Sequence, residues 1–177
     1  NAYLDSGGLE NADGFLQKID DCIDGTDKAP PVRPLLRAGL YWPNADFIDL
    51  ATIKSAWLHS SPVVAVVFYR ALMQAIDTGP VDALIDALRR AGLNPLPLFV
   101  ASLKDPESAA IVADALYLSS VDVILNLTSF AVSDAAQDPM GMYAFDRDVN
   151  RSAGPFGSVD APVLQVVLAS NRKSDWA

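Results

Sequence analysis

Two kinds of hydrophobic pattern alternate in the second half of the chain. Val63 to Phe68 is a continuous apolar run, and residues 96–101 form a second one after the turn Gly92-Leu93-Asn94. Such runs are typical of strands buried on both faces of a parallel sheet. Between them, apolar residues recur at the spacing of one helix face, at Val81, Leu84, Ile85 and Leu88. The alternation predicts a strand, a helix over 81–91 and a second strand.

Two more strands are predicted further along the chain, over 121–127 and 163–168, with a helix over 107–118. Right-handed crossovers would place the four strands, numbered along the chain, in the order 2-1-3-4. The predicted fold class is therefore α/β, with a flavodoxin- or Rossmann-like open parallel sheet. Residues 128–161 lack a strong helical period, and a loop of this length is usually functional or mobile.

The first sixty residues have a different pattern. The Gly7-Gly8 turn precedes a predicted helix over 9–23, and a proline-rich stretch over 26–45 interrupts regular helix. Residues 37–42 could form a short strand, and 46–58 a helix capped by Asn44 or Asp46. This predicts an N-terminal helical arm and linker over 1–60 and a truncated α/β domain over 61–177.

Composition excludes several classes of function. The 177 residues carry a net charge of −9, which argues against binding to nucleic acid or to an anionic membrane surface. Cys22 is the single cysteine and His59 the single histidine, so neither a disulfide nor a cluster of histidine ligands is possible within the chain. A phosphate-binding GxxxxGK[ST] loop and a GxGxxG loop are both missing, so ATP hydrolysis and NAD binding are not expected. The composition is typical of a cytoplasmic protein.

The candidate binding site lies where the predicted strands end. Ligands of open parallel sheets bind outside the carboxyl ends of the strands, where the winding direction reverses. The first crossover helix begins after Asp77 and Thr78, with free amides that favour an anion. A carboxylate-bearing ligand would suit the polar residues predicted at this edge: Tyr69, Arg70, Asp77, Thr78, Ser102, Lys104, Asn126 and Thr128, together with Phe130, Ser170, Asn171 and Arg172. Strand ends are also polar simply because they meet water.

The pattern assigns no catalytic residue and no metal ligand. Four aspartates of the long loop could bind a cation, although scattered acidic residues in loops are usually just solvated: Asp134, Asp138, Asp146 and Asp148. Trp42, Trp57 and Trp176 are more typical of packing than of a platform for a tetrapyrrole.

Eight short segments, in order, resemble the CobN/magnesium-chelatase family. They are residues 3–11 with a GG-x-EN element, 34–43, 68–70, 77–78, 81–84, 102–106, 122–128 and 161–166. Leu9 stands where that element often has proline. Within the family, Asp77 to Asp82 and Ser102 to Asp105 are more similar to the cobalt branch than to the magnesium branch.

The resemblance implies the large, corrin-binding subunit of an ATP-dependent cobaltochelatase. Such a subunit inserts cobalt, its metal substrate, into hydrogenobyrinic acid a,c-diamide on the aerobic route to cobalamin. ATP would be bound by partner subunits, an AAA-type ATPase and its companion, and not by this chain. Large subunits of the family are several times longer, so a fragment inactive alone is expected, with the metal-insertion residues outside it.

Three alternatives stay open at this point. The chain could belong to the magnesium branch, whose substrate is a porphyrin. It could be a flavodoxin-like small-molecule-binding module, or half of a periplasmic-type binding protein. It could also be a structural domain that docks partner subunits.

Overall fold

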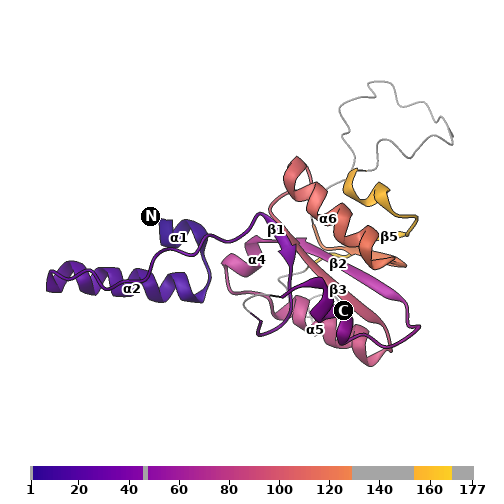
Figure 1. Ribbon diagram of the computed structural model, residues 1–177, viewed down its shortest axis with the longest axis horizontal. Coiled ribbons are helices and arrows are strands. Elements are labelled where there is room, and N and C mark those ends of the chain that lie inside the picture. Colours follow the sequence, from indigo (N-terminus) through magenta and orange to yellow (C-terminus); the bar gives the residue numbers. More distant parts are fainter. Residues whose placement is uncertain (1, 46–47, 129–153, 169–177) are drawn as a thin grey trace, which may run out of the picture.

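A computed structural model describes residues 2–45, 48–128 and 154–168. It consists of one α/β domain and a helical arm that projects from it (Figure 1). The domain contains a five-stranded sheet in the order β1-β3-β2-β4-β5. Its strands are β1 (Ala38–Leu40), β2 (Val63–Tyr69), β3 (Asn94–Val100), β4 (Val123–Asn126) and β5 (Val163–Gln165).

The predicted strand order is confirmed. The four predicted strands are β2, β3, β4 and β5, and the parallel pairs β3–β2, β2–β4 and β4–β5 give 2-1-3-4. The short strand expected within 37–42 is β1, which extends this sheet antiparallel to β3. The fifth strand, β5, is shorter than the predicted 163–168.

Two prolines lie inside the buried strand β3, and the geometry explains why they are tolerated. The carbonyl oxygen of Pro97 accepts from the Tyr41 amide at 3.0 Å, and that of Pro95 accepts from Trp57 Nε1 at 3.0 Å. A residue in a strand directs its nitrogen and its carbonyl to the same side, so both prolines direct theirs away from β2. The missing N–H groups therefore cost no hydrogen bond of the β2–β3 ladder.

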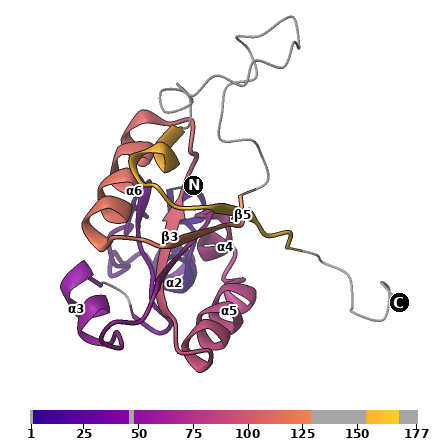
Figure 2. The same ribbon diagram turned by 90° about the vertical axis from the view of Figure 1, so that its right-hand side faces the viewer.

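Helices cover both faces of the sheet, as Figure 2 shows. On one face, α6 (Pro106–Ser119), α3 (Leu50–Ser55) and the short 3₁₀ helix η3 (Gly154–Ser158) enclose a core that includes Ile53, Leu116 and Phe156. On the other face, α5 (Gly79–Arg90) and α4 (Ala71–Gln74) pack over a core that includes Phe68 and Ile85. The sheet is thus sandwiched between two apolar layers, which fixes the positions of its strand ends.

The arm consists of α1 (Ala2–Ser6), α2 (Leu9–Asp24) and the return segment 25–37. The expected Gly7-Gly8 turn separates the two helices, with φ of 67° and 83°. The backbone amide of Gly8 donates to Gln74 O at 3.3 Å, and Gln74 Nε2 donates to Asp5 O at 3.0 Å. The base of the arm is therefore attached to α4.

Some expected boundaries are wrong. Of the helix predicted over 46–58, residues 46–47 lie outside the described residues, and among the others only α3 is α-helical. The α3 cap is Asp49 and not Asn44, because the Asp49 side chain accepts from Thr52 N at 2.7 Å. Beyond α3, Asn94 accepts from Leu58 N at 2.7 Å and donates to Leu58 O at 2.9 Å, which holds the chain in a non-helical course. The helices α1 and α4 were not expected.

The division into 1–60 and 61–177 stays a prediction. Strand β1 joins the sheet and Ile53 is buried in its core, so part of the first sixty residues packs within the α/β domain. Across the described ranges, no helix is both long enough and apolar enough to span a membrane.

Candidate functional site

A cavity of about 390 Å³ opens at the carboxyl ends of β2, β4 and β5. This is the place where the winding direction of the sheet reverses, because the chain passes from β2 to β3 on one side and then to β4 on the other. Among the described residues, apolar side chains form most of the wall, and Tyr69 and Gln165 are the polar ones. The lining residues are Tyr69, Ala71, Leu72, Leu127, Gln165, Val166, Val167 and Leu168.

Tyr69 reaches the cavity because β2 ends there. The next residue, Arg70, donates its backbone amide to Val100 O at 2.8 Å, and its own carbonyl oxygen accepts from Met73 N and Gln74 N. These bonds turn the chain from β2 into α4, which brings Leu72 under the cavity. The Arg70 guanidinium lies on another side, where Nη1 donates to Leu35 O at 3.3 Å.

Asn126 and Thr128 are buried beneath this edge, with 1% of each residue exposed. Asn126 Oδ1 accepts from Thr128 N at 3.1 Å and from Thr128 Oγ1 at 2.6 Å. Asn126 Nδ2 donates to Gln165 Oε1 at 3.0 Å, and Gln165 Nε2 donates to Thr128 O at 2.7 Å. This closed network joins the ends of β4 and β5 and orients Gln165, which also lines the cavity.

Asp77 and Thr78 stand at the start of α5. Thr78 occupies the N-cap position, but its hydroxyl donates to Asp82 Oδ2 at 3.4 Å and not to the helix backbone. Asp82 Oδ1 accepts from the hydroxyl of Tyr41 at 2.6 Å. Burial, reinforced by this bond to the Asp82 carboxylate, raises the pKa of Tyr41 to about 12. The start of α5 therefore carries a carboxylate already engaged by two hydroxyl groups.

Ser102 and Lys104 follow β3, near the side where β1 lies. Ser102 Oγ accepts from the Lys104 backbone amide at 3.1 Å, and this turn leads into α6. The α6 cap, Asp105, pairs with Arg37 at 2.9 Å and accepts from Ser108 Oγ at 2.6 Å. The Ser108 hydroxyl and amide, and then Arg37, hold the pKa of Asp105 below its usual value.

The structure thus distributes the eight candidate residues along the edge of the sheet. Tyr69 lines the cavity, while Asn126 and Thr128 support it from beneath. Arg70 turns toward Leu35, and Asp77 with Thr78 and Ser102 with Lys104 mark the beginnings of α5 and α6. Their part in ligand binding stays a prediction. The other candidates of the edge, Phe130, Ser170, Asn171 and Arg172, lie outside the described residues, as do the four loop aspartates and Trp176.

Sequence reasoning missed Gln165 and Leu72. Gln165 is the only polar residue in the otherwise apolar run 163–168, so its position in that run was an available signal. Leu72 lies on α4, a four-residue helix too short for a periodic pattern to reveal.

The cavity has the character of a site for an organic ligand. An apolar wall with two polar side chains can bury the face of a ring system, while a hydroxyl and an amide form hydrogen bonds to its edge.

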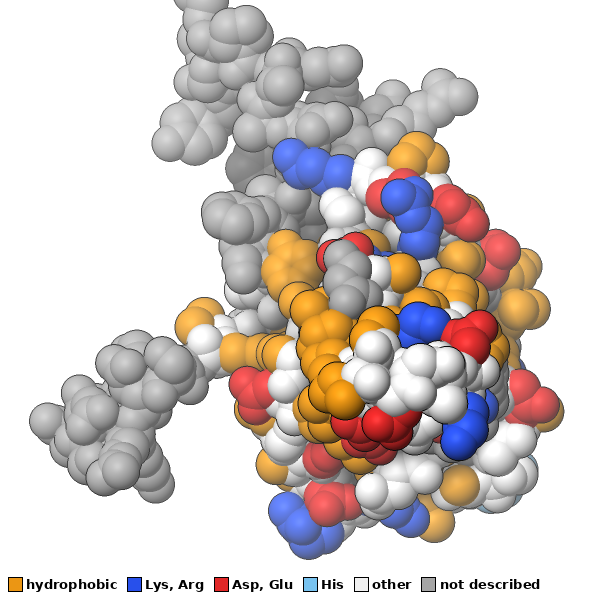
Figure 3. Space-filling view, turned by 90° about the vertical axis from the view of Figure 1, so that its left-hand side faces the viewer, with side chains coloured by type: hydrophobic (Ala, Val, Ile, Leu, Met, Phe, Trp, Pro, Cys, Tyr) orange, Lys and Arg blue, Asp and Glu red, His pale blue; other side chains and the backbone are white. Residues whose placement is uncertain are grey.

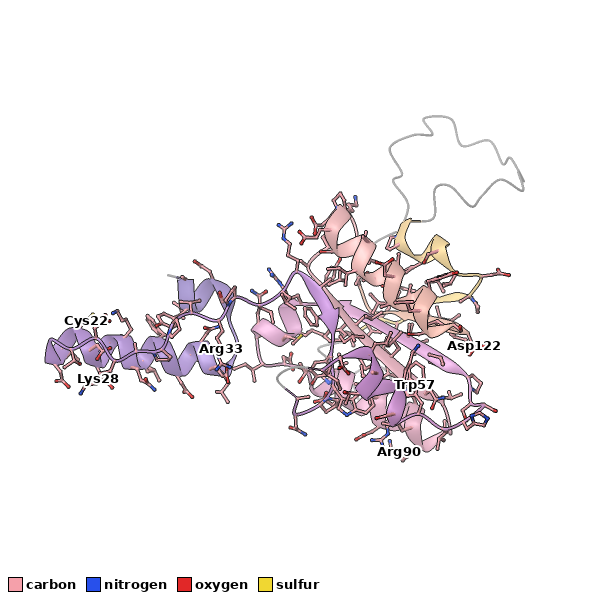
Figure 4. All side chains as sticks on the ribbon, viewed as in Figure 1. Cys22, Lys28, Arg33, Trp57, Arg90 and Asp122 are labelled. Atoms are coloured by element: carbon pink, nitrogen blue, oxygen red, sulfur yellow. The ribbon has the colours of Figure 1, made fainter. Side chains whose placement is uncertain are left out.

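The opposite end of β2 lies away from this cavity. Figure 4 shows Trp57 and Asp122 in the part of the domain farthest from the arm, where Asp122 accepts from Val63 N at 2.7 Å, at the start of β2. In the described part of the chain, no group of three or more His, Cys, Asp or Glu side chains is placed to hold a metal ion.

The sequence of this chain is similar to those of known proteins. A sequence model described as CobN/Magnesium Chelatase matches residues 1–177. The aerobic cobaltochelatase subunit CobN of a Sinorhizobium species is 36% identical over 183 residues, covering 99% of this chain and 13% of that protein. The aerobic cobaltochelatase subunit CobN of Pseudomonas aeruginosa is 34% identical over 177 residues, covering 98% of this chain and 13% of its own length.

A solved structure shares the fold. The catalytic subunit of cobaltochelatase from Mycobacterium tuberculosis superimposes with a TM-score of 0.69 at 24% identity. The match covers 99% of this chain and 14% of that one. The chain therefore spans only a small part of the length of the relatives that it matches.

Proposed function

The chain belongs to the CobN/magnesium chelatase family, and on this premise we propose that it is part of the large, corrin-binding subunit of an aerobic cobaltochelatase. The observation that carries the proposal is the identity of 36% and 34% to two cobaltochelatase CobN subunits over nearly the whole chain. The cobalt-like segments 77–82 and 102–105 support the cobalt branch over the magnesium branch.

In this proposal the complete subunit inserts cobalt, the metal substrate, into hydrogenobyrinic acid a,c-diamide. ATP is bound by an AAA-type partner subunit and its companion. The residues that bring the metal to the ring belong to the remainder of the subunit, which accounts for most of its length. The 177 residues alone are then inactive.

This part of the subunit would supply one wall of the corrin cleft, formed by the cavity at the carboxyl ends of β2, β4 and β5. Its apolar lining suits the face of the macrocycle, and the Tyr69 hydroxyl and the Gln165 amide suit the carboxylate and amide groups at the corrin edge. A cavity of about 390 Å³ lies near the lower end of the range for drug-sized ligands, about 300–1,000 Å³, and a corrin is larger than such ligands. It would therefore hold an edge of the ring and not the whole.

A second role, as a framework that holds neighbouring parts of the subunit, is favoured by one observation. Asn126 and Thr128 are buried and bonded to each other and to Gln165, so these side chains already have hydrogen-bond partners within the sheet. In that case the corrin contacts come from elsewhere in the subunit.

The test is a fluorescence-quenching titration of the full-length parent subunit with hydrogenobyrinic acid a,c-diamide and, separately, with a porphyrin. Binding of the corrin with a clear preference over the porphyrin supports the cobalt branch. Preference for the porphyrin moves the chain to the magnesium branch, and binding of neither ligand contradicts both assignments. The same titration of the 177-residue chain separates the two roles, because a framework alone should not bind the corrin.

A further inference from the structure

The arm helix α2 buries the opposite side from the one that its sequence would suggest. The residues it buries are Asn11, Gly14 and Asp21, which face α1 and the return segment. Asn11 Nδ2 donates to Arg33 O at 2.8 Å, and its Oδ1 accepts from Arg33 N at 2.9 Å. A Cβ on Gly14 would lie 2.7 Å from the Tyr3 ring, so close packing holds this side of α2 against α1.

The large apolar residues of α2 lie on the other side of the helix and are exposed. We call this surface the α2 stripe, formed by Leu9, Ala12, Leu16, Ile19 and Ile23. Its members repeat every three or four residues, which places them on one helix face. Leu9 is 64% exposed, Leu16 59% and Ile23 77%. A buried polar side opposite an exposed apolar side is the reverse of an ordinary surface helix and indicates a surface that another element covers.

Acidic side chains border the α2 stripe. Asp13, Asp20 and Asp24 are exposed and, at 100° per residue, fall side by side along one flank of the helix. Figure 3 views the molecule from the arm side and shows hydrophobic side chains gathered on this face with acidic ones next to them. A matching surface would therefore be apolar in the middle and basic along one edge.

Contacts with α4 hold the arm in place within this chain. A Cβ on Gly7 would lie 2.8 Å from Gln74 Cα, and the hydrogen bonds from Gly8 N to Gln74 O and from Gln74 Nε2 to Asp5 O join the arm to α4. At this junction lies a cavity of about 620 Å³, whose lining is mostly apolar and includes Leu9, the first member of the α2 stripe, with Val32, Leu35 and Met73. Glu10, Asn11 and Arg33 add polar groups to the same lining. The apolar surface thus continues from the stripe into the angle between arm and domain.

We propose that another part of the same large subunit, outside these 177 residues, packs against the α2 stripe and enters the cavity at its base. The covering element presents an apolar face with Lys or Arg side chains opposite Asp20 and Asp24. The inference uses the family assignment but not the corrin site, so it stands or falls independently of the proposed ligand.

The length of the subunit and the apolar character of the α2 stripe both favour a covering element from the same subunit. The chain spans 13% of the length of its CobN relatives, so most of such a subunit lies outside it. A segment of the same polypeptide is present at high effective concentration. A large apolar strip is also typical of permanent contacts, since interfaces that form and dissociate expose a more polar surface.

Thiol labelling of the full-length parent subunit tests the proposal. Leu16→Cys places a thiol on the α2 stripe. The matched control, Gln17→Cys, places a thiol at the next residue of the helix, which is also exposed but lies outside the stripe. With the labelled peptide identified by mass spectrometry, we expect Leu16→Cys to react at least about tenfold more slowly than Gln17→Cys, because a covered thiol reacts only when the contact opens. In the 177-residue chain the two thiols should react at similar rates.

Three outcomes would overturn the proposal. Equal rates in the full-length subunit mean that the α2 stripe is uncovered there. If the Leu16→Cys thiol is protected only when partner subunits are added, a partner subunit covers the α2 stripe. If the protection is lost on dilution, a second copy of the subunit covers it.

A second pair of variants checks the same surface by stability. Leu16→Asp with Ile19→Asp should lower the melting temperature of the full-length subunit but not that of the 177-residue chain, whereas Gln17→Asp should change neither. An unchanged melting temperature of the full-length double variant contradicts the inference.

Discussion

Asn126 donates its side-chain amide to Gln165 across the β4–β5 pair, and through this bond a buried side chain of one strand orients a cavity-lining side chain of the next. The Gln165 side-chain amide in turn donates a hydrogen bond to Thr128 O. The polar end of the sheet is therefore a closed set of hydrogen bonds, and the shape of the cavity wall depends on residues that themselves do not line it.

Replacing Asn126 should destabilise the end of the sheet. In Asn126→Ala the Thr128 amide and hydroxyl lose their acceptor inside a buried region, which should cost about 1–3 kcal/mol of unfolding free energy. Urea denaturation of the 177-residue chain would measure this loss. Ser102→Ala is the control, because it removes one partly exposed acceptor, and an equal effect of both substitutions would contradict the structural role of Asn126.

Tyr41 predicts a loss of stability at alkaline pH. Its pKa is raised from the ordinary 10.0 to about 12, so the folded state favours the protonated hydroxyl. The resulting stability is complete below pH 10 and is lost as the pH rises toward 12. In Tyr41→Phe that part of the pH dependence should disappear, together with about 0.5–1.5 kcal/mol at neutral pH from the lost bond to Asp82.

Denaturation curves between pH 7 and pH 11 would test this prediction. Tyr117→Phe is the control, since Tyr117 is 71% exposed. An alkaline loss of stability that is unchanged in Tyr41→Phe would show that other groups cause it.

Asp21 predicts a loss of arm structure in acid. Its carboxylate accepts from the Thr26 hydroxyl and from the amides of Lys28 and Ala29, both at 2.7 Å. The Thr26 bond contributes most to lowering the pKa of Asp21, and burial partly opposes it. A lowered pKa stabilises the folded arm above the unfolded value of about 3.9, and this contribution is lost as the pH falls through the folded value.

Asp21→Asn should therefore accelerate amide exchange in α2 at pH 6 and make that exchange less sensitive to acid. Asp20→Asn is a suitable control, because Asp20 is an exposed neighbour on the same helix. If both variants exchange alike, the bonds of Asp21 do not hold the return segment against α2.

Alanine substitutions at two glycines of the arm distinguish the cost of backbone strain from the cost of steric crowding. Gly7 and Gly25 both have φ of 67°, but a Cβ on Gly7 would meet Gln74 at 2.8 Å whereas Gly25 faces open space. Gly25→Ala should cost about 1–2 kcal/mol, the penalty for a left-handed residue. Gly7→Ala should cost more and should also expose the junction to proteolysis. Equal costs would mean that α4 yields to the added methyl group.

The centre of the sheet could be predicted from the sequence because β2 and β3 are long apolar runs with a periodic helix between them. Val63 to Phe68 contains six apolar residues in succession, and all six are buried. The arm was harder to interpret. The helix over 9–23 was predicted correctly, but the amphipathic pattern gives no sign that Asn11 and Asp21 would be buried and Leu16 exposed. That arrangement depends on contacts with Tyr3 and the return segment, which are tertiary and not periodic.

The candidate site was predicted as an edge of the sheet but not as a set of converging side chains. Parallel strands guarantee that Tyr69 and Asn126 end at the same edge. Side-chain direction and burial depend on the neighbours, so the sequence could not show that Arg70 turns to Leu35 or that Asn126 and Thr128 bond each other. Gln165 could have been found as the single polar residue of its strand.

Tyr69 provides the most direct test of the proposed corrin wall. It ends β2 with part of its surface exposed and is the one aromatic side chain among the described residues that line the cavity. A ring that stacks on the edge of a bound macrocycle contributes by its apolar area, and its hydroxyl adds a hydrogen bond. In the full-length parent subunit, Tyr69→Ala should weaken binding of hydrogenobyrinic acid a,c-diamide about tenfold, equivalent to about 1.4 kcal/mol. Tyr69→Phe should recover most of that loss.

Tyr117→Ala is the matched control for this test, since Tyr117 lies on α6 and takes no part in lining the cavity. Unchanged melting temperatures of the variants would exclude misfolding as the cause of weaker binding. If Tyr69→Ala binds the corrin as tightly as Tyr117→Ala, the carboxyl edge of this sheet does not contact the ligand. The chain then acts as a framework, and the buried Asn126–Thr128–Gln165 network serves only to hold its sheet together.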